Sequence, residues 1–318
     1  MGERLAALAA ALLIDVLLGD PPNRYHPVAW MGAAIGWGKA RARGGRMARF
    51  AWGLGILLGG VGMSALAGWA VERGTARWPR WLRAIVLGAV LKSTFSLRGL
   101  TRAAREVHIA LTRGDLVEAR RALAWHLVSR STANLSASQV AAATIESVAE
   151  NTSDGVIAPL FYYGLGGLPA ALAYRFVNTA DAMLGYRDDV HEWLGKGPAR
   201  ADDALNLVPA RLTALALVVA AWLWGENARG AWRVWRRDAG QTSSPNAGHP
   251  MSAMAGALGV ELEKVGHYRL GRGFPPPHPQ DIERAVRLAH TAVLVALMGG
   301  VLLAWWREYT VKSEKYRL

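Results

Sequence analysis

Two long runs without a charged residue constrain the fold of this chain more than any other feature. Residues 50–71 and 288–306 contain no Asp, Glu, Lys or Arg over about one membrane thickness each. The second run ends in two tryptophans followed by Arg307, as expected where a span meets the membrane surface. A large soluble helical protein is the alternative, but it would have to bury both runs. We therefore interpret them as transmembrane helices.

Shorter or interrupted apolar stretches extend this pattern: residues 5–18, 81–97, 155–174 and 212–225. The third contains GLGGLP, so it either spans once or folds back as a re-entrant hairpin. The fourth reaches spanning length if residues 204–211 continue its helix. We predict an all-α, polytopic integral membrane protein with about five to six membrane-embedded segments and an extramembrane helical portion.

The polar parts of the chain suggest how this domain is organised. We expect one membrane-embedded domain over residues 1–318, with an extramembrane helical region at about 98–150 and a loop and helix region at about 226–287. Gly114 and Asp115 predict a helix stop followed by an N-cap, and Ser138 predicts the cap of the next helix. No period-two strand pattern is present, and the Pro- and Gly-rich segments predict loops.

Charge and composition exclude several classes of function. Lys and Arg number 37 against 24 Asp and Glu, a net charge of +13. The basic loops fit cytoplasmic loops and contact with a lipid bilayer better than a nucleic-acid site, because no aromatic recognition pattern accompanies them. The absence of Cys excludes thiolate metal sites and cysteine nucleophiles. Neither a P-loop nor a Rossmann turn is present.

Four polar clusters interrupt the apolar sequence and are candidate sites. The first contains Asp15 inside an apolar helix, Asp20 at its end, and His26 after a Pro-rich turn. A carboxylate within a span usually faces a cavity or a partner. The alternative is that Asp20 and the following proline merely stop the helix.

The second cluster carries three carboxylates at helical spacing. Glu146, Glu150 and Asp154 fall at i, i+4 and i+8, with Asn151 beside them. Like charges at this spacing repel unless a cation compensates them. Oxygen ligands suit Mg²⁺, which binds through one or two carboxylates together with substrate phosphate. A solvated acidic face is the alternative, which the flanking apolar sequence disfavours.

The third and fourth clusters are polar stripes and a turn. Tyr174, Asn178, Asp181 and Gly185 form one stripe, where Arg175 lies close to Asn178; helix–helix contact is the alternative. A second stripe contains Asp202, Asp203, Asn206 and Arg211. The fourth cluster is a Ser-Pro-Asn turn, with Ser244 and Asn246, before a helix rich in small residues that allow close approach of a backbone or a ligand. The N-terminus of this helix is a candidate phosphate-binding site, for which residue spacing alone is a weak signal.

Five sequence blocks from these clusters follow one another in order: GDP–HPV–G, ESVAENTSDGVIAPLF, YRFVNTADAMLGY, ARADDALNLVPARL and SPNAGHPMxAMAGALG. Together they resemble the CobD/CbiB family of cobalamin biosynthesis, the adenosylcobinamide-phosphate synthases, over about residues 15–287. The resemblance implies a multi-pass enzyme of the cytoplasmic (inner) membrane. Such an enzyme joins adenosylcobyric acid to (R)-1-amino-2-propanol or its O-phosphate through an amide bond. ATP and Mg²⁺ are implied, and other late cobalamin-pathway membrane enzymes are candidate partners.

The resemblance also carries motif membership onto individual residues. It implies a catalytic set of Asn178, Asp181, Arg200, Asp202, Asp203 and Arg211. It implies a substrate- or nucleotide-binding set of Asp20, His26, Asn151, Asn206, Ser244 and Asn246. It implies a metal-binding set of Glu146, Glu150 and Asp154. Some relatives carry Glu where this chain has Met251, so no catalytic carboxylate is assigned there.

Chemical roles follow for some of these residues, and two rival functions remain open. Arg200 and Arg211 would grip phosphate or the corrin carboxylate, and Asp202 or Asp203 would take the amine proton. A membrane transporter would also contain buried charges and broken helices. A sensor or scaffold similar to AmpE would have neither activity. The combination of ENTxDG with SPN favours the enzyme.

Overall fold

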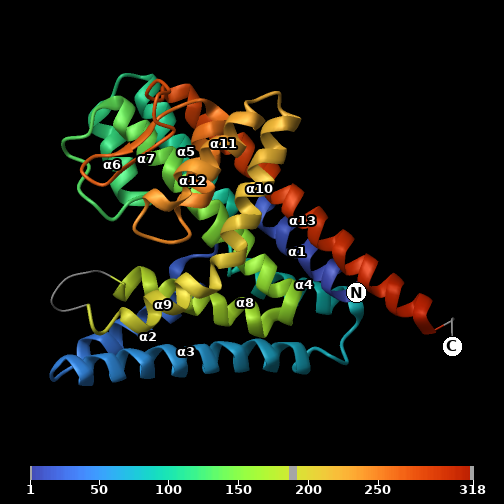
Figure 1. Ribbon diagram of the computed structural model, residues 1–318. Helices are drawn as coiled ribbons and strands as arrows, with labels where there is room; N and C mark the ends of the chain where they lie inside the picture. The colour runs from blue at the N-terminus through green and yellow to red at the C-terminus, as the bar shows by residue number, and fades with distance from the viewer. Residues whose placement is uncertain (1, 186–191, 316–318) are drawn as a thin grey trace. The chain divides into compact units, whose positions relative to one another are not determined.

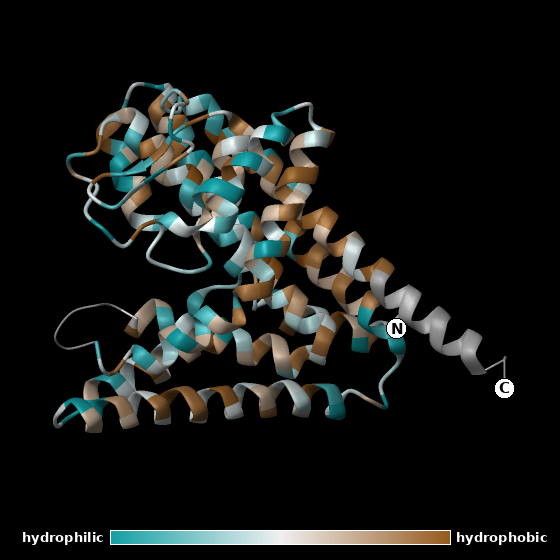
Figure 2. Ribbon diagram, in the orientation of Figure 1, coloured by the Kyte–Doolittle hydropathy of each residue, from teal (hydrophilic) through white to brown (hydrophobic). Residues whose placement is uncertain are grey.

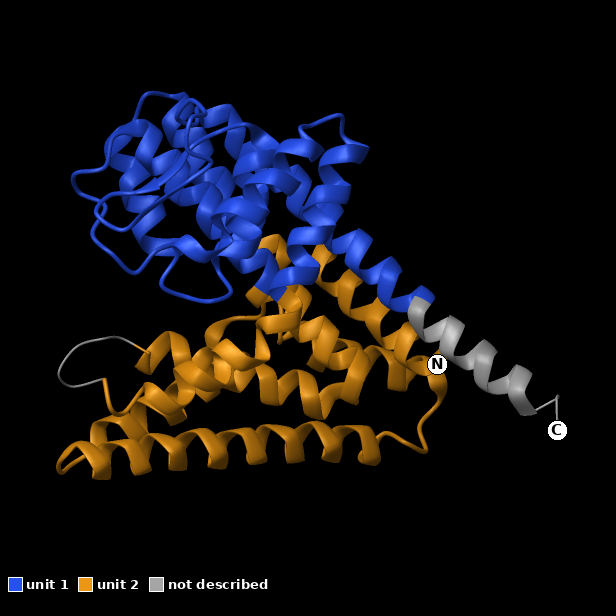
Figure 3. Ribbon diagram, in the orientation of Figure 1, with its two compact units in different colours: residues 1, 100–153, 210–318 blue, residues 2–99, 154–209 orange. Residues whose placement is uncertain are grey.

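The computed structural model describes residues 2–185 and 192–315, with side chains up to residue 302. The fold is all-α apart from one short hairpin, as the sequence predicts (Figure 1). Backbone contacts divide the chain into two compact units that alternate along the sequence (Figure 3). Unit 1 comprises residues 100–153 and 210–318 with Met1, and unit 2 comprises residues 2–99 and 154–209. The two stretches expected outside the membrane fall almost wholly within unit 1.

Unit 2 consists of helices and short turns: α1 (Gly2–Leu17), a 3₁₀ turn (Asn23–Tyr25), α2 (Pro27–Arg41), α3 (Arg46–Gly74), α4 (Arg80–Lys92), α8 (Ala158–Leu184) and α9 (Lys196–Leu205). Helix α3 packs against α8 and α9, and α1 packs against α4. Hydrophobic residues run along most of α3 (Figure 2). The close contact of α1 with α4 requires a glycine at position 88, because a Cβ there would lie 2.7 Å from the Cβ of Ala10.

Helix α8 is not a straight helix, because it reverses direction at Gly166 and Gly167. Gly167 has φ +69° and ψ −157°, a conformation that essentially only glycine adopts. The rings of Tyr162 and Tyr174 stack with centroids 5.0 Å apart, whereas twelve residues of straight helix would separate them by about 18 Å. The backbone N–H of Leu168, which starts the second arm, donates to Glu72 of α3 at 2.9 Å. The GLGGLP segment therefore folds back as the hairpin alternative predicts.

Unit 1 contains α5 (Leu97–Thr112), α6 (Leu116–His126), α7 (Ala137–Thr152), α10 (Leu207–Leu223), α11 (Ala228–Asp238), a 3₁₀ turn (Ala239–Gln241), α12 (Gly248–Leu258), β1 (Leu262–Lys264), β2 (Tyr268–Leu270) and α13 (Pro279–Lys315). Helices α5 and α10 begin in unit 2. Helix α7 packs against α6, α12, α13 and β1 around a core of alanine and branched aliphatic side chains. The antiparallel β1–β2 hairpin, with Leu262 opposite Leu270, was not predicted, because its strands are too short to show an alternating pattern.

Local signals in the sequence located some helix ends correctly and others not. Asp115 caps α6 by accepting from the N–H of Glu118, as predicted. The cap of α7 is Ser136 rather than Ser138, because Ser136 forms a reciprocal capping box with Gln139. The small residues of α12 allow a close approach to α11, where a Cβ on Gly256 would lie 2.3 Å from the carbonyl oxygen of Gly230. This close approach is between two backbones, which is one of the two alternatives that the small residues allow.

Among the described residues, three helical segments are long and apolar enough to cross a membrane by length and composition: Arg46–Gly74, Ala137–Leu184 and Pro279–Leu302. Two pairs of helices joined at a bend raise the number to five if each pair is one span: α4 with α5, bent by 42°, and α9 with α10, bent by 46°. The predicted extension of residues 212–225 by 204–211 therefore contains a break near Asn206. The uncharged runs at 50–71 and 288–306 lie in α3 and α13, as expected.

Candidate functional site

The reversal of α8 at Gly166 and Gly167 brings polar residues from distant segments into one network in unit 2. The hydroxyl of Tyr174 lies 2.8 Å from Oδ1 of Asn206, and Nδ2 of Asn206 donates to Asp202 at 2.9 Å. Nδ2 of Asn178 donates to the other oxygen of Asp202 at 3.2 Å. A guanidinium N–H of Arg175 donates to Oδ1 of Asn178 at 3.2 Å. Each amide group thus joins the central carboxylate to an outer side chain.

The centre of the network is buried and lies at the bend between α9 and α10, whereas Asn178 and Arg175 are half-buried. Asn206 is 1% exposed and ends α9, and Asp202 is one turn earlier on the same helix. Tyr162 donates to the carbonyl of Leu205 at 2.8 Å and so connects the first arm of the α8 hairpin to the end of α9. Buried polar groups are stable only when paired, so these side chains hold the hairpin and the bend in place together.

Asp154 lies in a π-helical turn, Ser153–Ile157, that separates α7 from α8. Such turns are frequent at functional sites. The carbonyl oxygen of Asp154 lies 3.1 Å from the hydroxyl of Tyr174, so the turn is tied to the polar network. The π turn also changes the helical register after Thr152. The predicted shared face of Glu146, Glu150 and Asp154 assumed a continuous α-helix, and this assumption is wrong.

Other predicted residues surround the same helices. Asp203 lies beside Asp202 with its side chain 28% exposed, and Arg200 lies 3.5 Å from it and is 76% exposed. Asp181 lies near the end of α8, where its carbonyl accepts the N–H of Gly185 at 2.7 Å. A Cβ on Gly185 would lie 2.2 Å from Oδ1 of Asp181, so glycine is required there. The motif residue Tyr186 lies outside the described residues.

Asp20 and His26 belong to an ion-pair cluster around a buried lysine of α4. Nζ of Lys92 lies 3.1 Å from Asp15 and 2.5 Å from Asp20, and the lysine side chain is 2% exposed. Ser96 donates to Asp20, and Nε2 of His26 lies 3.6 Å from it. Burial alone would raise the pKa of Asp20, but the hydrogen bonds from His26, Lys92 and Ser96 and the charge of Lys92 outweigh it and hold the pKa below its usual range.

In unit 1, Glu146 has a buried carboxylate that lies next to Arg130 and the phenol of Tyr268. Its side chain is 7% exposed, and Arg130 lies 3.8 Å from Oε2. Oε1 has no hydrogen-bond partner among the described residues. The phenol of Tyr268, on β2, has a raised pKa because of burial and the nearby charges of Glu146 and Glu150. Glu150 is one turn further along α7 and half-buried, so two acidic groups share this region.

Asn151 and Ser153, which follow Glu150 in the chain, differ from each other in their hydrogen bonds. The amide of Asn151 donates back to Ser147, to its carbonyl at 2.9 Å and its hydroxyl at 3.1 Å. The hydroxyl of Ser153 is buried and has no partner in the described part of the chain. Its motif neighbours were singled out from the sequence, but this serine was not.

The Ser-Pro-Asn turn precedes α12 in unit 1. Oγ of Ser244 accepts from the N–H groups of Asn246 and Ala247 at 3.3 Å each. The side chain of Asn246 is buried, and the exposed Arg211 of α10 lies 3.4 Å from its Oδ1. The indole of Trp235 donates to His249 at 2.8 Å. Burial and the charge of Arg211 lower the pKa of His249. The turn thus places an arginine and backbone N–H groups at the start of a helix.

The predicted site residues are divided between the two units. Those of unit 2 are Asp20, His26, Asp154, Asn178, Asp181, Arg200, Asp202, Asp203 and Asn206, and those of unit 1 are Glu146, Glu150, Asn151, Arg211, Ser244 and Asn246. Across residues 2–185 and 192–302, no three His, Asp or Glu side chains lie close enough to hold a metal ion alone. A metal at these carboxylates needs further ligands from a substrate.

Sequence reasoning missed two residues that the structure places beside the predicted ones, Lys92 and Tyr162. Lys92 stood out only as an isolated charge in an apolar stretch, which is a signal for a buried ion pair. Tyr162 stacks on Tyr174, but no periodic pattern links the two arms of a hairpin. Arg175 lies close to Asn178 as predicted, and its Nε is buried without a hydrogen-bond partner in the described structure.

Comparison with known proteins agrees with the arrangement of these motifs. The family model described as "CobD/Cbib protein" matches residues 8–289. "Cobalamin biosynthesis protein CobD" of Dehalococcoides mccartyi is 41% identical over 307 residues, covering 94% of this chain and 98% of the relative. "Probable cobalamin biosynthesis protein CobD" of Methanothermobacter thermautotrophicus is 40% identical, covering 95% and 99%. "Cobalamin biosynthesis protein CobD" of Geobacter metallireducens is 45% identical, covering 82% of each chain. No solved structure matches. The chain therefore belongs to the CobD/CbiB family of cobalamin biosynthesis proteins.

Proposed function

We propose that this chain is an ATP-dependent amide ligase of the cytoplasmic membrane that joins adenosylcobyric acid to (R)-1-amino-2-propanol or its O-phosphate. The product is adenosylcobinamide or its phosphate. Membership of a cobalamin biosynthesis family carries this proposal. It is supported by the meeting of Asn178, Asp202 and Asn206 in one hydrogen-bonded network, because these residues belong to two different motifs, carried by α8 and α9.

The chemistry requires activation of the acid, because amide formation from a carboxylate in water is unfavourable. A carboxylate oxygen of adenosylcobyric acid attacks the γ-phosphorus of ATP, and ADP leaves. The amine then attacks the carbonyl carbon of the acyl phosphate, inorganic phosphate leaves, and the amine loses one proton to a base. In such reactions the protein mainly positions the reactants and neutralises charge.

Glu146 and Glu150 fit a Mg²⁺ ion that arrives with a nucleotide. Both supply the hard oxygen ligands that Mg²⁺ prefers, and Oε1 of Glu146 is buried without a hydrogen-bond partner among the described residues. The absence of a three-carboxylate group in the described structure fits an ion that takes its remaining ligands from phosphate and water. Bound there, Mg²⁺ would neutralise phosphate charge. Asp154 remains a proposed ligand through its motif.

Two arginines would bind anionic groups of the substrates. The side chain of Arg200 is largely exposed, so most of its N–H groups face outward. Its guanidinium group also lies 3.5 Å from the partly exposed carboxylate of Asp203. Arg211 lies beside the Ser-Pro-Asn turn that precedes α12, where the N–H groups of Asn246 and Ala247 donate to Oγ of Ser244. A guanidinium group and a helix start both favour phosphate or carboxylate.

Asp203 is the better base of the two adjacent aspartates. Both oxygens of Asp202 already accept hydrogen bonds from asparagine amides, and its side chain is buried. Asp203 is more exposed and therefore within reach of a substrate amine. Asp202 would position Asn178 and Asn206, while Asp203 would accept the proton.

The deciding experiment uses the purified full chain with adenosylcobyric acid, the aminopropanol or its phosphate, and Mg-ATP. Mass spectrometry of the corrinoid should detect the amide product, formed together with ADP. Asp154→Asn should abolish turnover, whereas Glu283→Gln, which removes an exposed carboxylate of α13, should retain it. Corrinoid flux into vesicles without an amide product would support a transporter instead, and neither activity would support a sensor or scaffold.

A further inference from the structure

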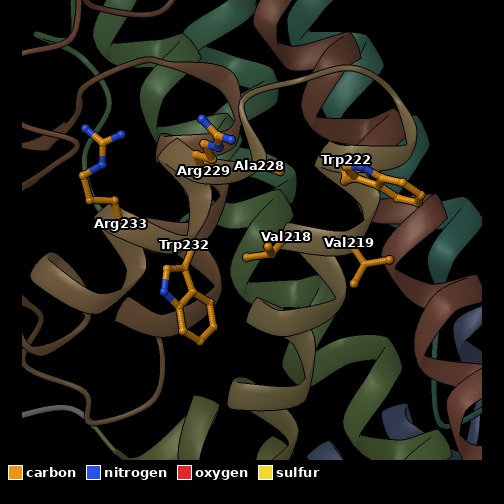
Figure 4. A pocket seen from close by; sticks show the side chains of 7 residues that line it. All are labelled: Val218, Val219, Trp222, Ala228, Arg229, Trp232 and Arg233. Atoms are coloured by element: carbon orange, nitrogen blue, oxygen red, sulfur yellow. The ribbon is translucent and has the colours of Figure 1, made fainter.

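Helices α10 and α11 of unit 1 line a wide-open apolar pocket of about 520 Å³. Its apolar lining consists of Val218, Val219 and Trp222 of α10 and Ala228 and Trp232 of α11 (Figure 4). Trp222 is 71% exposed and Trp232 is 46% exposed. Two exposed indoles around an apolar hollow leave hydrophobic surface that no described part of this unit covers.

Two arginines of α11 form the polar rim of this pocket. Arg229 and Arg233 line it one helical turn apart, and in Figure 4 both guanidinium groups project to the same end while the indole of Trp232 extends the other way. Both are exposed, and within residues 2–185 and 192–302 neither has an ion-pair or hydrogen-bond partner. By contrast, Arg237 is paired with Asp238 at 2.7 Å. The rim therefore carries two uncompensated positive charges.

The position of the pocket along the chain indicates its surroundings. Helix α10 belongs to a bent pair that is long and apolar enough to cross a membrane. Trp222 lies at its end, where interfacial tryptophans are common, and basic residues after a span mark the cytoplasmic side. Anionic lipids of the cytoplasmic leaflet attract such basic segments.

We propose that the pocket between α10 and α11 is a binding site for an anionic phospholipid. An acyl chain lies over the valines between the two indoles, and the phosphate group accepts hydrogen bonds from Arg229 and Arg233. A guanidinium fork matches phosphate oxygens in shape and charge. A zwitterionic lipid would fill the apolar part equally well but would leave the rim less well neutralised.

A second groove provides an internal comparison. The groove in unit 2, of about 760 Å³, is lined by α2, α3, α4 and α8 and includes Trp30, Trp37 and Trp52, but no charged residue. It can hold apolar chains without selecting a headgroup. Filling it should therefore leave the preference between anionic and zwitterionic lipids unchanged.

Native mass spectrometry of the delipidated full chain tests the proposal. The chain is titrated with phosphatidylglycerol and, separately, with phosphatidylcholine of identical acyl chains. The wild-type chain should retain phosphatidylglycerol about tenfold more strongly. The double variant Arg229→Gln/Arg233→Gln should lose this preference, because each lost guanidinium contact is charge-assisted. The matched pair Arg102→Gln/Arg105→Gln, on exposed positions of α5, removes the same charge and should preserve it.

Two filling variants separate a pocket from a charged surface. Val219→Trp should weaken retention of both lipids. Gly59→Leu, in the uncharged groove where nothing lies within 4 Å of a new Cβ, should leave the preference intact. The proposal is overturned if the wild type retains both lipids equally, if the arginine variant keeps its preference, or if Val219→Trp has no effect. Displacement by inorganic phosphate alone, or occupation by a second copy of the chain, would also overturn it.

Discussion

Two buried carboxylates, Asp202 of unit 2 and Glu146 of unit 1, differ in how completely they pair with neighbouring side chains. In unit 2, the amides of Asn178 and Asn206 donate to both oxygens of Asp202, and these amides are in turn bonded to Tyr174 and Arg175. In unit 1, the equally buried Glu146 retains an oxygen without a hydrogen-bond partner in the described structure. A closed network holds helices together, whereas a buried oxygen left open is costly unless a ligand uses it.

Because Asp202 is fully hydrogen-bonded and Glu146 is not, we expect mutations at these two sites to have opposite effects on stability and activity. Removing a member of the closed network should lower stability, because its partners become unpaired in a buried region. Neutralising the carboxylate of Glu146, whose Oε1 has no hydrogen-bond partner in the described structure, should lower activity without lowering stability. The predictions below test this contrast, from the largest expected effect to the smallest.

The closed network depends on the reversal of α8 at Gly167. Gly167→Ala should lower the free energy of unfolding by about 3 kcal/mol or more, because alanine disfavours this backbone conformation and its Cβ would lie 2.3 Å from Oε1 of Glu72. Thermal unfolding in detergent would measure the effect. Gly164→Ala is the matched control, since nothing lies within 4 Å of its new Cβ. Equal stability of the two variants would argue against the hairpin.

Asn206→Ala removes the amide that joins Tyr174 to Asp202. We expect the free energy of unfolding to fall by about 3 kcal/mol, since a hydroxyl and a carboxylate oxygen each lose a buried partner. Denaturant unfolding followed by tryptophan fluorescence would measure this loss. The exposed Asn134→Ala should change stability by less than about 0.5 kcal/mol. A result for Asn206→Ala as small as that for the control would show that the network does not contribute to the stability of unit 2.

Glu146→Gln tests the open carboxylate of unit 1. Turnover should fall about 100-fold, comparable to the loss of a group that stabilises charge in an active site. Stability should stay within about 1 kcal/mol of the wild type, because the substitution preserves shape and removes an incompletely compensated buried charge. Product formation and thermal unfolding should be measured on the same preparation. A stability loss as large as that of Asn206→Ala would show that the contrast between the units is wrong.

The adjacent aspartates sharpen the comparison within one helix turn. Asp203→Asn should lower kcat by about 100-fold and flatten the acidic limb of the pH–rate profile, with little change in unfolding temperature. Asp202→Asn should mainly lower the unfolding temperature, because both of its oxygens accept hydrogen bonds. Kinetics and unfolding of both variants would separate the roles. The reverse pattern would make Asp202 the base.

The smallest effect concerns pH and the ion-pair cluster around Lys92. Because the folded pKa of Asp20 lies below its unfolded value of about 4, its contribution to stability is present above that value and is lost as pH falls through the folded pKa. The contribution should be under about 1 kcal/mol, since a third of the side chain is exposed and water screens its charge. Unfolding midpoints at pH about 6 and about 3 should therefore differ less for Asp20→Asn than for the wild type. An unchanged difference would exclude this linkage.

Particular elements show how far the sequence leads. The uncharged runs identified α3 and α13, and the order of five motifs identified the family, because both signals are local. The stop at Gly114 and the cap at Asp115 were also readable, since capping depends on a few adjacent residues. The cap of α7 was placed two residues late, because two serines compete and only the contact with Gln139 decides between them.

The arrangement of the candidate site was less predictable from the sequence than the identity of its residues. Motif membership named Asn178, Asp202 and Asn206 individually, but not their joining through amide hydrogen bonds. Lys92 was passed over because its partners, Asp15 and Asp20, lie more than 70 residues away in the sequence. The π turn after Thr152 escaped notice because helical periodicity carries no sign of one extra residue in a turn.

By itself the sequence determined the apolar helices, the basic loops and the family. The length of an apolar run, the excess of basic residues in a loop and the residues of a motif are all properties of neighbouring positions in the chain. Only the tertiary structure decided that α8 turns back on itself, that amides donate to both oxygens of Asp202, and that Oε1 of Glu146 has no hydrogen-bond partner in the described structure. These outcomes depend on contacts between helices distant in the chain, where packing and the pairing of buried polar groups select one arrangement among several that the sequence pattern allows.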